Sequence, residues 1–438
     1  MERNIELERK IESVLLRWKS SRNRLPLLVQ GARQVGKTHS LLTFGKKQYR
    51  NLAYFNFESN PELHALFETS LSPKKLLSQL SILSGNEIFE EETLIFFDEI
   101  QNCERALTSL KYFAEDAPAY HIAAAGSLLG VALNRSKYSF PVGKVQIEQV
   151  FPMDFEEFLW ASGKKDAASA IHDCFHDRHA CTLHPHLLDL FQVYIALGGM
   201  PRAVKEYLNS GDWDFITSIQ KDILIGYTAD MSKYADAAET VKIMAAYNSI
   251  PSQLAKPNRK FQYSIIKTGA RASVYESPVE WLTASGLIIK VQKCLNPQLP
   301  VKASAIPDYF KIYLNDTGLL CSKFGLNNEV IAFEPFQISG IKGVLAENYV
   351  ATALQVNGFE PYYWDSDGKA EVDFIIQDKN GRVIPVEVKS SENVRSKSLN
   401  EYIKKYKPEK VFRVSTKNFG SENNLVSVPL YAMFCVTP

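Results

Sequence analysis

An eight-residue phosphate-binding loop constrains this chain more than any other feature. Residues 31–38 read GARQVGKT, which matches the pattern G-x-x-x-x-G-K-[ST]. The apolar run 25–30 before the loop predicts a buried strand, and residues 38–44 after it predict a helix. A strand, a glycine-rich turn and a helix start in this order aim several backbone N–H groups at a bound phosphate. The pattern therefore predicts a nucleotide site in an α/β domain.

Each position of the loop has an expected role. Lys37 is expected to reach the β- and γ-phosphates, and Thr38 is expected to offer its hydroxyl to Mg²⁺. The other loop residues are expected to surround the phosphates: Gly31, Ala32, Arg33, Gln34, Val35 and Gly36. The predicted cofactors are ATP and Mg²⁺.

A second motif follows at the required distance along the chain. Residues 93–97 form an apolar strand that ends in Asp98 and Glu99. Asp98 is expected to hold the metal at the carboxyl end of that strand, and Glu99 is expected to orient and deprotonate the attacking water. Together with the phosphate loop, this pair favours an ATPase over a GTPase or a small-molecule kinase.

Further strands are expected at residues 52–58, 121–127 and 145–150, with helices between them at 61–67, 73–83 and 106–114. This alternation predicts a doubly wound parallel sheet. Ser127 stands at the tip of the fourth predicted strand. It is interpreted as a sensor of the γ-phosphate or as the N-cap of a following helix, and the two roles are compatible.

Composition narrows the class of protein. The chain has 438 residues, enough for several domains, and a formal net charge of +1, so any contact with nucleic acid must come from local patches. It has no apolar run long enough for a membrane span, and its charged first residues do not resemble a signal peptide. Six cysteines without C-x-x-C spacing indicate reduced thiols and a cytoplasmic location.

A cluster of histidines and cysteines invites a zinc hypothesis. The spacing matches no common zinc module, so a polar helical linker over residues 166–190 is the favoured interpretation. The residues of the cluster are His172, Cys174, His176, His179, Cys181, His184 and His186.

Residues 240–275 contain no acidic residue, and tyrosine and phenylalanine stand among their lysines and arginines. A helix at 278–285 and a strand at 287–291 follow, which favours a winged-helix-like domain with a basic face toward nucleic acid. The alternative is a small helical packing domain with a solvated basic face.

The last hundred residues carry a second chemical pattern. Asp373 heads the predicted strand 370–376, and the strand 383–389 bears Glu387 and Lys389 on one face. This order is typical of metal-dependent phosphodiesterases, in which Asp373 and Glu387 would hold Mg²⁺ or Mn²⁺ and Lys389 would position the water. Glu347, on the preceding helix 343–354, is expected to complete the metal shell. The alternative is an inactive scaffold kept for binding.

With these residues in view, the chain resembles bacterial ATP-binding proteins that join an AAA-type ATPase domain to a C-terminal domain similar to restriction endonucleases. The resemblance covers nearly the whole chain. It rests on residues 27–38, 97–101, 125–127, 198–201 and 315–318 and on the set from Glu347 to Lys389. The chain departs from this family at one place. Family members often carry Gly-Arg just before the fifth strand, where the arginine would act across a subunit interface. This chain has Gly143 and Lys144 there, and Arg135 is a weaker substitute for that arginine.

The predicted organisation has four parts. Residues 1–160 form the P-loop AAA-type ATPase domain, 161–235 a helical lid, 236–332 the winged-helix-like domain and 333–438 the α/β restriction-endonuclease-like domain. The predicted function is ATP binding and hydrolysis coupled to nucleic acid, contacted through residues 240–275 and 389–413, with a possible metal-dependent nuclease and a homo-oligomer. The alternative is a nucleotide-dependent switch with an inactive nuclease-like domain and a protein partner.

Overall fold

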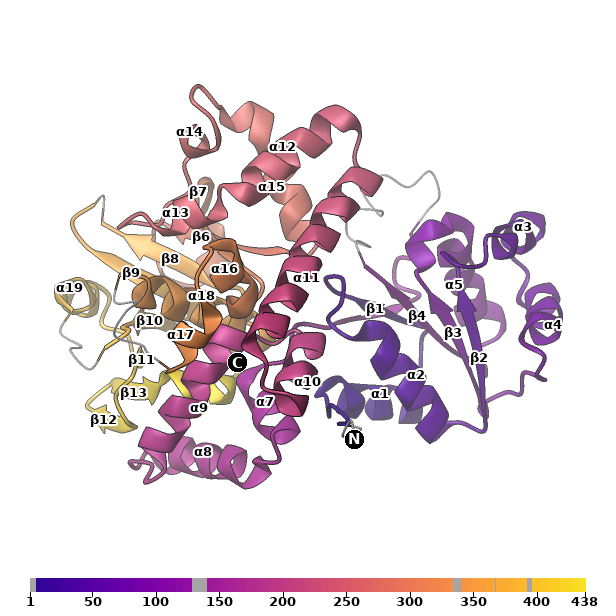
Figure 1. The fold of residues 1–438 in the computed structure, drawn as a ribbon, viewed down its shortest axis with the longest axis horizontal. Coiled ribbons are helices and arrows are strands. Elements are labelled where there is room, and N and C mark those ends of the chain that lie inside the picture. Colours follow the sequence, from indigo (N-terminus) through magenta and orange to yellow (C-terminus); the bar gives the residue numbers. More distant parts are fainter. Residues whose placement is uncertain (1–4, 128–139, 334–339, 367, 392–395) are drawn as a thin grey trace. The chain divides into compact units, whose positions relative to one another are not determined.

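The computed structural model describes residues 5–127, 140–333, 340–366, 368–391 and 396–438 (Figure 1). The chain divides into two compact units. We call Glu8–Phe151 with Ala284–Gly286 the amino-terminal unit, and the remaining residues the carboxyl-terminal unit. Within the described residues, no helix combines the length and the apolar character that crossing a membrane would need.

The amino-terminal unit is built on a five-stranded sheet in the order β2-β3-β4-β1-β5, in which neighbouring strands are parallel. The strands are β1 (Leu27–Gln30), β2 (Asn51–Asn56), β3 (Thr93–Asp98), β4 (His121–Gly126) and β5 (Gln146–Gln149). The predicted parallel sheet is confirmed. Because the strands are parallel, the residues that follow β1, β3 and β4 lie at the same edge.

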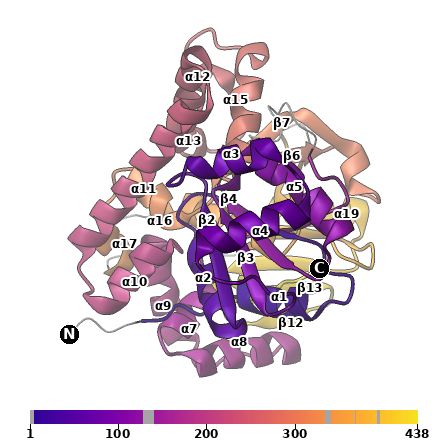
Figure 2. The ribbon, with the colours of Figure 1, turned by 90° about the vertical axis from the view of Figure 1, so that its right-hand side faces the viewer.

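Helices cover both faces of this sheet (Figure 2). They are α1 (Ile11–Ser20), α2 (Lys37–Gln48), α3 (Glu62–Thr69), α4 (Pro73–Ser84) and α5 (Glu104–Asp116), with a 3₁₀ turn at Ile100–Asn102. Alternate strand residues such as Leu28, Phe55 and Phe97 form one core cluster with side chains of α3, α4 and α5. On α2, Gly45 lies where a Cβ would come within 2.7 Å of the Leu52 side chain, so this helix packs closely on the strands.

The carboxyl-terminal unit begins with a helical region. Its helices are α7 (Phe155–Ala161), α8 (Lys165–Asp177), α9 (His184–Leu197), α10 (Pro201–Asn209), α11 (Trp213–Tyr234), α12 (Ala237–Asn248), α13 (Ile250–Leu254), α14 (Tyr263–Ile266) and α15 (Ala272–Ala284). Later helices are α16 (Thr317–Lys323), α17 (Asn328–Phe333), α18 (Lys342–Val356) and α19 (Lys397–Tyr406). Side-chain caps explain several starts: Asp154, Asp212, Asp236, Asp316 and Ser396 each accept from a backbone N–H of the first turn.

Two glycine-containing motifs from distant parts of the sequence meet in this unit. The Gly199 N–H donates to Asp316 Oδ2 at 2.6 Å, and the Leu319 N–H donates to Asp316 Oδ1 at 2.8 Å. A Cβ on Gly318 would lie 2.2 Å from the Leu197 carbonyl oxygen, so only glycine fits there. Motifs 198–201 and 315–318 therefore fasten the helical region to the start of α16.

An eight-stranded mixed sheet completes the carboxyl-terminal unit in the order β12-β13-β11-β10-β9-β8-β6-β7. The strands are β6 (Ile288–Cys294), β7 (Ala305–Leu314), β8 (Tyr362–Asp365), β9 (Glu371–Gln377), β10 (Val383–Val388), β11 (Val411–Ser415), β12 (Gly420–Glu422) and β13 (Leu425–Pro429). Short 3₁₀ segments lie at Val301–Ser304 and Leu430–Cys435.

The antiparallel pair β6–β7 joins this sheet through the parallel pairing of β6 with β8. These are the strands that the sequence assigned to the region of the winged-helix-like domain. The predicted boundary between residues 332 and 333 thus falls between strands of one sheet. The winged-helix and endonuclease-like identities of the two segments remain predictions.

Candidate functional site

The phosphate loop adopts backbone conformations that its glycines allow. Gly31 has φ 151° and Gly36 has φ 98°, and Gln34 also lies in the left-handed region with φ 67°. A Cβ on Gly31 would come within 2.1 Å of the Val150 carbonyl oxygen. Glycine is therefore required where the loop passes β5, and the loop then runs directly into α2.

Lys37 is buried, with 6% of its surface exposed. Its Nζ donates to the carbonyl oxygens of Gly31 at 2.9 Å and Ala32 at 2.8 Å. The Lys37 ammonium group thus binds two carbonyl oxygens of its own loop. A phosphate that enters the loop would compete with these carbonyl oxygens for the ammonium group. Around it, Ala32 and Val35 are buried, and Arg33 and Gln34 are exposed.

Asp98 ends β3 with its carboxylate 3% exposed and bound by neutral donors. Thr38 Oγ1 donates to Oδ1 at 3.1 Å, Tyr54 Oη donates to Oδ2 at 2.9 Å, and Asn56 Nδ2 lies 3.4 Å from Oδ2. The structure therefore brings together the two residues expected to hold Mg²⁺, Thr38 and Asp98. Tyr54 and Asn56 were missed because nothing in their local sequence marks them; their position on the neighbouring strand β2 brings them here.

Glu99 follows with an unusual backbone. Its φ of 51° lies in the left-handed region, and its N–H donates to Asp98 Oδ1 at 3.1 Å. Gln101 Nε2 donates to Glu99 Oε2 at 2.5 Å. Burial raises the pKa of the Glu99 carboxyl; the Gln101 hydrogen bond opposes this, and the Asp98 charge adds to it. A carboxylate with a raised pKa is a stronger base, which suits the predicted role.

Ser127 directly follows β4, the strand that lies between β1 and β3, and is 5% exposed. It is therefore at the sheet edge that carries Thr38 and Asp98, and its role as a sensor remains a prediction. Lys144 Nζ pairs with Glu115 at 3.0 Å. Arg135 lies outside the described residues.

The carboxyl-terminal acids lie on adjacent strands. Phe374 and Val386 are paired in the antiparallel β9–β10 ladder, which makes Asp373 and Glu387 cross-strand neighbours on the opposite face. The Val388 N–H donates to Asp373 Oδ2 at 2.8 Å. The structure thus brings together the two acids that the sequence analysis expects to hold a metal ion.

Glu387 is 3% exposed, and its two oxygens differ. Oε1 lies 2.7 Å from Lys389 Nζ and accepts from Ser396 Oγ at 2.7 Å. Oε2 is buried and has no hydrogen-bond partner among the described residues. Burial, assisted by the Asp373 charge, raises the pKa of Glu387 to about 7. Burial alone would lower the pKa of Lys389, but the Glu387 carboxylate outweighs it and holds that pKa above its ordinary value.

Glu347, predicted as a third metal ligand, is engaged by other groups. It is 1% exposed on α18, with Arg259 and Tyr313 in direct contact and Lys311 Nζ at 3.2 Å from Oε1. Its place in the metal shell remains a prediction. Across the described part of the chain, no group of three or more His, Cys, Asp or Glu side chains is arranged to hold a metal ion.

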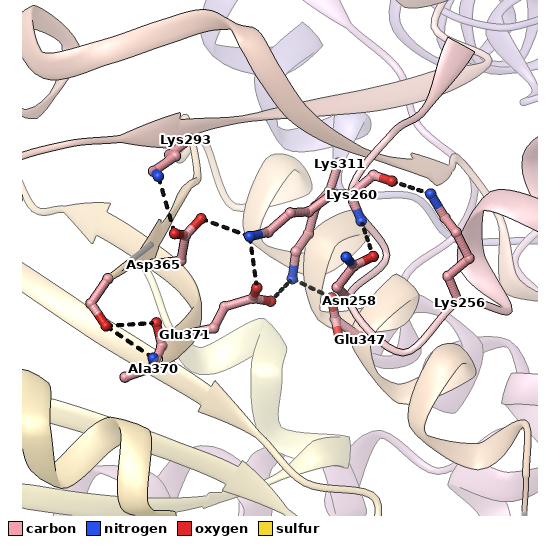
Figure 3. Close-up of polar contacts among 10 residues, drawn as sticks. Lys256, Asn258, Lys260, Lys293, Lys311, Glu347, Asp365, Ala370 and Glu371 are labelled. Atoms are coloured by element: carbon pink, nitrogen blue, oxygen red, sulfur yellow. Dashed lines mark hydrogen bonds and ion pairs between the residues drawn. The ribbon is translucent and has the colours of Figure 1, made fainter. Parts of the chain in front are cut away.

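Glu347 belongs to a buried network of opposite charges (Figure 3). Lys311 Nζ pairs with Glu371 at 2.6 Å, Lys260 Nζ pairs with Asp365 at 2.9 Å, and Lys293 Nζ pairs with Asp365 at 3.0 Å. Burial would raise the pKa of Asp365, but the two lysines outweigh it and hold that pKa below its usual value.

The network changes how the basic segment 240–275 is interpreted. Arg259 and Lys260 come from that segment, but their charges contact carboxylates of the same unit. Sequence reasoning missed these contacts because the partner acids lie about a hundred residues further along. On the other side of the acid pair, Arg413 of the predicted segment 389–413 is the register partner of Glu387 on β11.

The histidine and cysteine cluster makes protein contacts. His172 Nε2 lies 2.7 Å from Glu156, His184 Nδ1 lies 2.9 Å from Tyr431 Oη, and Cys174 Sγ lies 3.6 Å from His179 Nε2. The six cysteines of the chain are free thiols. These contacts account for the cluster as part of helix packing.

Comparisons with known proteins agree with the amino-terminal geometry. Residues 23–159 match the family model of an AAA domain. Residues 188–330 and 342–433 match two domains of unknown function, DUF8612 and DUF4143. The chain therefore contains an AAA-type P-loop ATPase domain. No curated protein matches the chain.

Several solved structures are similar over much of the chain. A Walker-type ATPase of Pyrococcus abyssi is 17% identical, with 74% of this chain and 97% of that chain covered and a TM-score of 0.47. The ORC2 protein of Aeropyrum pernix is 10% identical, with 75% and 93% covered and a TM-score of 0.36. The RuvB Holliday junction branch migration motor of Thermotoga maritima is 13% identical, with 67% and 88% covered and a TM-score of 0.30. At these TM-scores, none of them assigns a function to this chain.

Proposed function

We propose that this protein binds and hydrolyses Mg²⁺-ATP at the carboxyl edge of the five-stranded sheet. The observation that carries the proposal is the hydrogen bond of 3.1 Å between Thr38 Oγ1 and Asp98 Oδ1. It joins the phosphate loop to the acidic strand end, which are the two groups that hold the metal in P-loop ATPases. Lys37 directly precedes Thr38 in the chain, and Glu99 directly follows Asp98. Both of these expected catalytic residues are therefore neighbours of the two groups that hold the metal.

Each group at the site has its own proposed role in ATP binding or hydrolysis. The loop backbone from Gly31 to Thr38 and the start of α2 offer N–H groups and a positive dipole end to the phosphates. Lys37 exchanges its two carbonyl partners for phosphate oxygens. Mg²⁺, when bound by Thr38 and Asp98, neutralises phosphate charge. Glu99 accepts the proton of the attacking water, and Ser127 is placed to contact the γ-phosphate.

Lys37→Ala tests this assignment. The loop backbone is kept in that variant, but the charge that contacts the phosphates is removed. We expect loss of tight ATP binding and of hydrolysis with an unchanged unfolding transition, measured by calorimetric titration and phosphate release. Lys144→Ala, which removes a surface pair with Glu115, is the control and should behave as wild type. Normal turnover in Lys37→Ala would exclude the site.

A second activity is favoured by one specific observation, the buried and unpartnered Oε2 of Glu387 beside Asp373. An unsatisfied buried carboxylate oxygen costs free energy unless a proton or a cation reaches it. We propose that Asp373 and Glu387 hold Mg²⁺ or Mn²⁺ there, and that the site cleaves phosphodiesters. Such a metal supplies charge neutralisation and a more acidic bound water. Lys389, fixed on Glu387 Oε1 at 2.7 Å, then orients the water.

The second activity is tested by linkage between metal binding and folding. Mn²⁺ should raise the melting temperature of the carboxyl-terminal unit, measured without nucleotide in the Lys37→Ala background so that the ATP site does not contribute. Asp373→Asn should abolish the shift. Lys389→Ala should keep the shift but lose strand cleavage. Identical responses of Asp373→Asn and its parent to Mn²⁺ would leave the alternative, a nucleotide-dependent switch with an inactive nuclease-like domain and a protein partner.

The nuclease proposal implies nucleic acid as the partner. Arg413 supports it as the register partner of Glu387, and the lysines of residues 389–413 add positive charge to the same segment of the chain. Assembly into a homo-oligomer, a lid role for residues 161–235 and a cytoplasmic location are further parts of the proposal. Each follows from the sequence interpretation.

A further inference from the structure

Arg259 contacts one of the predicted metal-site residues from outside the segment that carries these acids. Residues 342–433 match one domain model, whereas Arg259 lies in the segment 188–330 that matches another. Its guanidinium pairs with Glu347 of α18. A Cβ built on Gly343 would lie 3.2 Å from Arg259 Nη2 and 3.9 Å from Ser390 Oγ. Gly343, at the start of α18, is therefore close both to the guanidinium and to the residue that follows Lys389.

The turn that carries Arg259 is held firmly on β7. Lys260 forms an isolated bridge with Lys311, and the Phe261 N–H donates to the Phe310 carbonyl at 2.8 Å. The Phe261 ring stacks on Phe310 with centroids 4.9 Å apart. Within this turn Arg259 has φ 50°, a conformation that non-glycine residues adopt rarely and mainly where the surrounding structure imposes it. The fold thus fixes the position of Arg259 through the contacts of the two residues that follow it.

One feature of this arrangement is unfavourable without a ligand. Arg259 Nε is buried and has no hydrogen-bond partner among the described residues. An anion that accepts a hydrogen bond from the guanidinium would relieve this cost. Because 22% of the Arg259 side chain is exposed, the guanidinium is reachable from solvent.

We propose that Arg259 binds a non-bridging oxygen of the scissile phosphate, and that Glu347 positions Arg259 for this contact. The planar guanidinium suits a phosphate because it offers parallel N–H donors, of which Glu347 occupies one edge. Glu347 is itself fixed by Lys311 and Tyr313. The inference rests on the proposed phosphodiesterase function and names the residue that recognises its substrate.

Binding and cleavage are measured separately to test it. Binding is measured by titrating fluorescent duplex DNA with the full chain in Ca²⁺ at several salt concentrations, and RNA of the same sequence is titrated in the same way. Cleavage is followed separately in Mn²⁺. We expect Arg259→Ala to raise the Kd about 10- to 100-fold and to reduce the salt slope by about one. Added methylguanidinium should restore part of the binding. Arg259→Lys should keep the slope but bind several-fold more weakly, since it lacks the fork.

Arg382→Ala is the matched control. Arg382 also pairs with a buried carboxylate, Asp378, with 2.7 Å between Nη2 and Oδ2, so its removal leaves a comparable orphan acid. It should bind nucleic acid as wild type does. If Glu347 positions Arg259, Glu347→Gln should weaken binding in wild type but add nothing in the Arg259→Ala background.

The outcomes separate this inference from the function on which it rests. Cleavage by wild type together with equal affinities for Arg259→Ala, Arg382→Ala and wild type would overturn the Arg259 contact and leave the phosphodiesterase standing. Binding that depends on Arg259 but not Arg382, without cleavage by wild type, would support the contact and remove the phosphodiesterase. Absence of any binding by wild type would overturn the contact as well.

Discussion

Asp98 in the amino-terminal unit accepts hydrogen bonds from neutral groups, those of Thr38, Tyr54 and Asn56. Glu347 in the carboxyl-terminal unit instead contacts two cations, Arg259 and Lys311, and a tyrosine hydroxyl. Both carboxylates are almost completely buried. Neutral donors leave the charge of Asp98 uncompensated, as the proposed Mg²⁺ site requires. Cations compensate the charge of Glu347 within the protein, which suits its proposed role of positioning Arg259. These two buried acids therefore differ in whether their charge is already balanced by the protein.

The largest expected effect concerns the proposed ATP site, whose acids are expected to act on a ligand. Glu99→Gln keeps the shape of the side chain but cannot accept a proton, so kcat for ATP should fall about 10²- to 10⁴-fold with ATP affinity nearly unchanged. Single-turnover hydrolysis and nucleotide titration measure the two quantities. Glu92→Gln, which changes an acid paired at the surface with Arg50, is the control. A loss of ATP affinity with normal turnover of the bound fraction would make Glu99 a binding residue.

Lys311→Met tests how much the buried ion pairs around Glu347 contribute to stability. Lys311 is 1% exposed and pairs with both Glu347 and Glu371, so its loss removes one cation from each acid and leaves Glu347 to Arg259 and Glu371 to Lys260 at 3.9 Å. We expect the carboxyl-terminal unit to lose about 3 kcal/mol of unfolding free energy in urea, the lower end of the range for breaking a buried pair. Lys302→Met breaks an exposed pair with Glu360 and should cost under about 1 kcal/mol. Equal effects of the two substitutions would show that burial does not distinguish these pairs.

The pH dependence of stability distinguishes Glu387 from the paired acids. Its folded pKa of about 7 lies above the ordinary value, so its ionisation opposes folding. Metal-free stability should therefore fall as pH rises from about 4.5 to about 7, by up to about 3 kcal/mol from this group. Glu387→Gln should flatten that part of the curve. Asp365, whose pKa is lowered, contributes with the opposite sign: its stabilisation is lost as pH falls through its folded pKa. Urea unfolding between pH 4.5 and 7.5 gives the comparison, and a curve unchanged by Glu387→Gln would contradict it.

The smallest effect is expected from Tyr54→Phe. This variant removes one of the neutral donors to Asp98, at 2.9 Å, and leaves Thr38 in place. The cost should be about 0.5–1.5 kcal/mol of stability in the amino-terminal unit, with Mg²⁺-ATP affinity changed less than about fivefold. Thermal unfolding and nucleotide titration measure both. A loss of affinity as large as that of Lys37→Ala would mean that Tyr54 takes part in holding the metal.

Local patterns predicted which residues meet at the carboxyl edge of the five-stranded sheet. The strands, the glycine-rich turn and the acids at a strand end occupy short stretches, and their strand and helix periods can be read directly. Residues 31–38 and Asp98 thus lie at one sheet edge, as expected. The pairing of Asp373 with Glu387 was also predictable, because adjacent antiparallel strands bring their residues into register over a short distance in sequence.

The rest depends on contacts between segments far apart along the chain. The sequence predicts strands at residues 287–291 and from residue 309, but no local signal says that these strands, β6 and β7, extend the sheet of β8 to β13. Similarly, the sequence of residues 256–260 shows a basic turn, and only the folded chain puts Arg259 on Glu347 and Lys260 on Asp365. A solvated basic face and a buried cation have the same local sequence, because burial is decided by what packs against the turn.

By itself, then, the sequence determined a P-loop ATPase domain and the presence of a second acidic pattern, and it predicted the cofactor-binding residues, since each depends on residue types at short fixed spacings. The tertiary structure decided which acids have neutral partners and which have cationic ones. At Asp98 and Glu347, that choice sets whether the carboxylate charge is left uncompensated or is balanced by an internal ion pair. It depends on side chains that arrive from strands and turns a hundred residues away, and on the low dielectric of the site in which they meet.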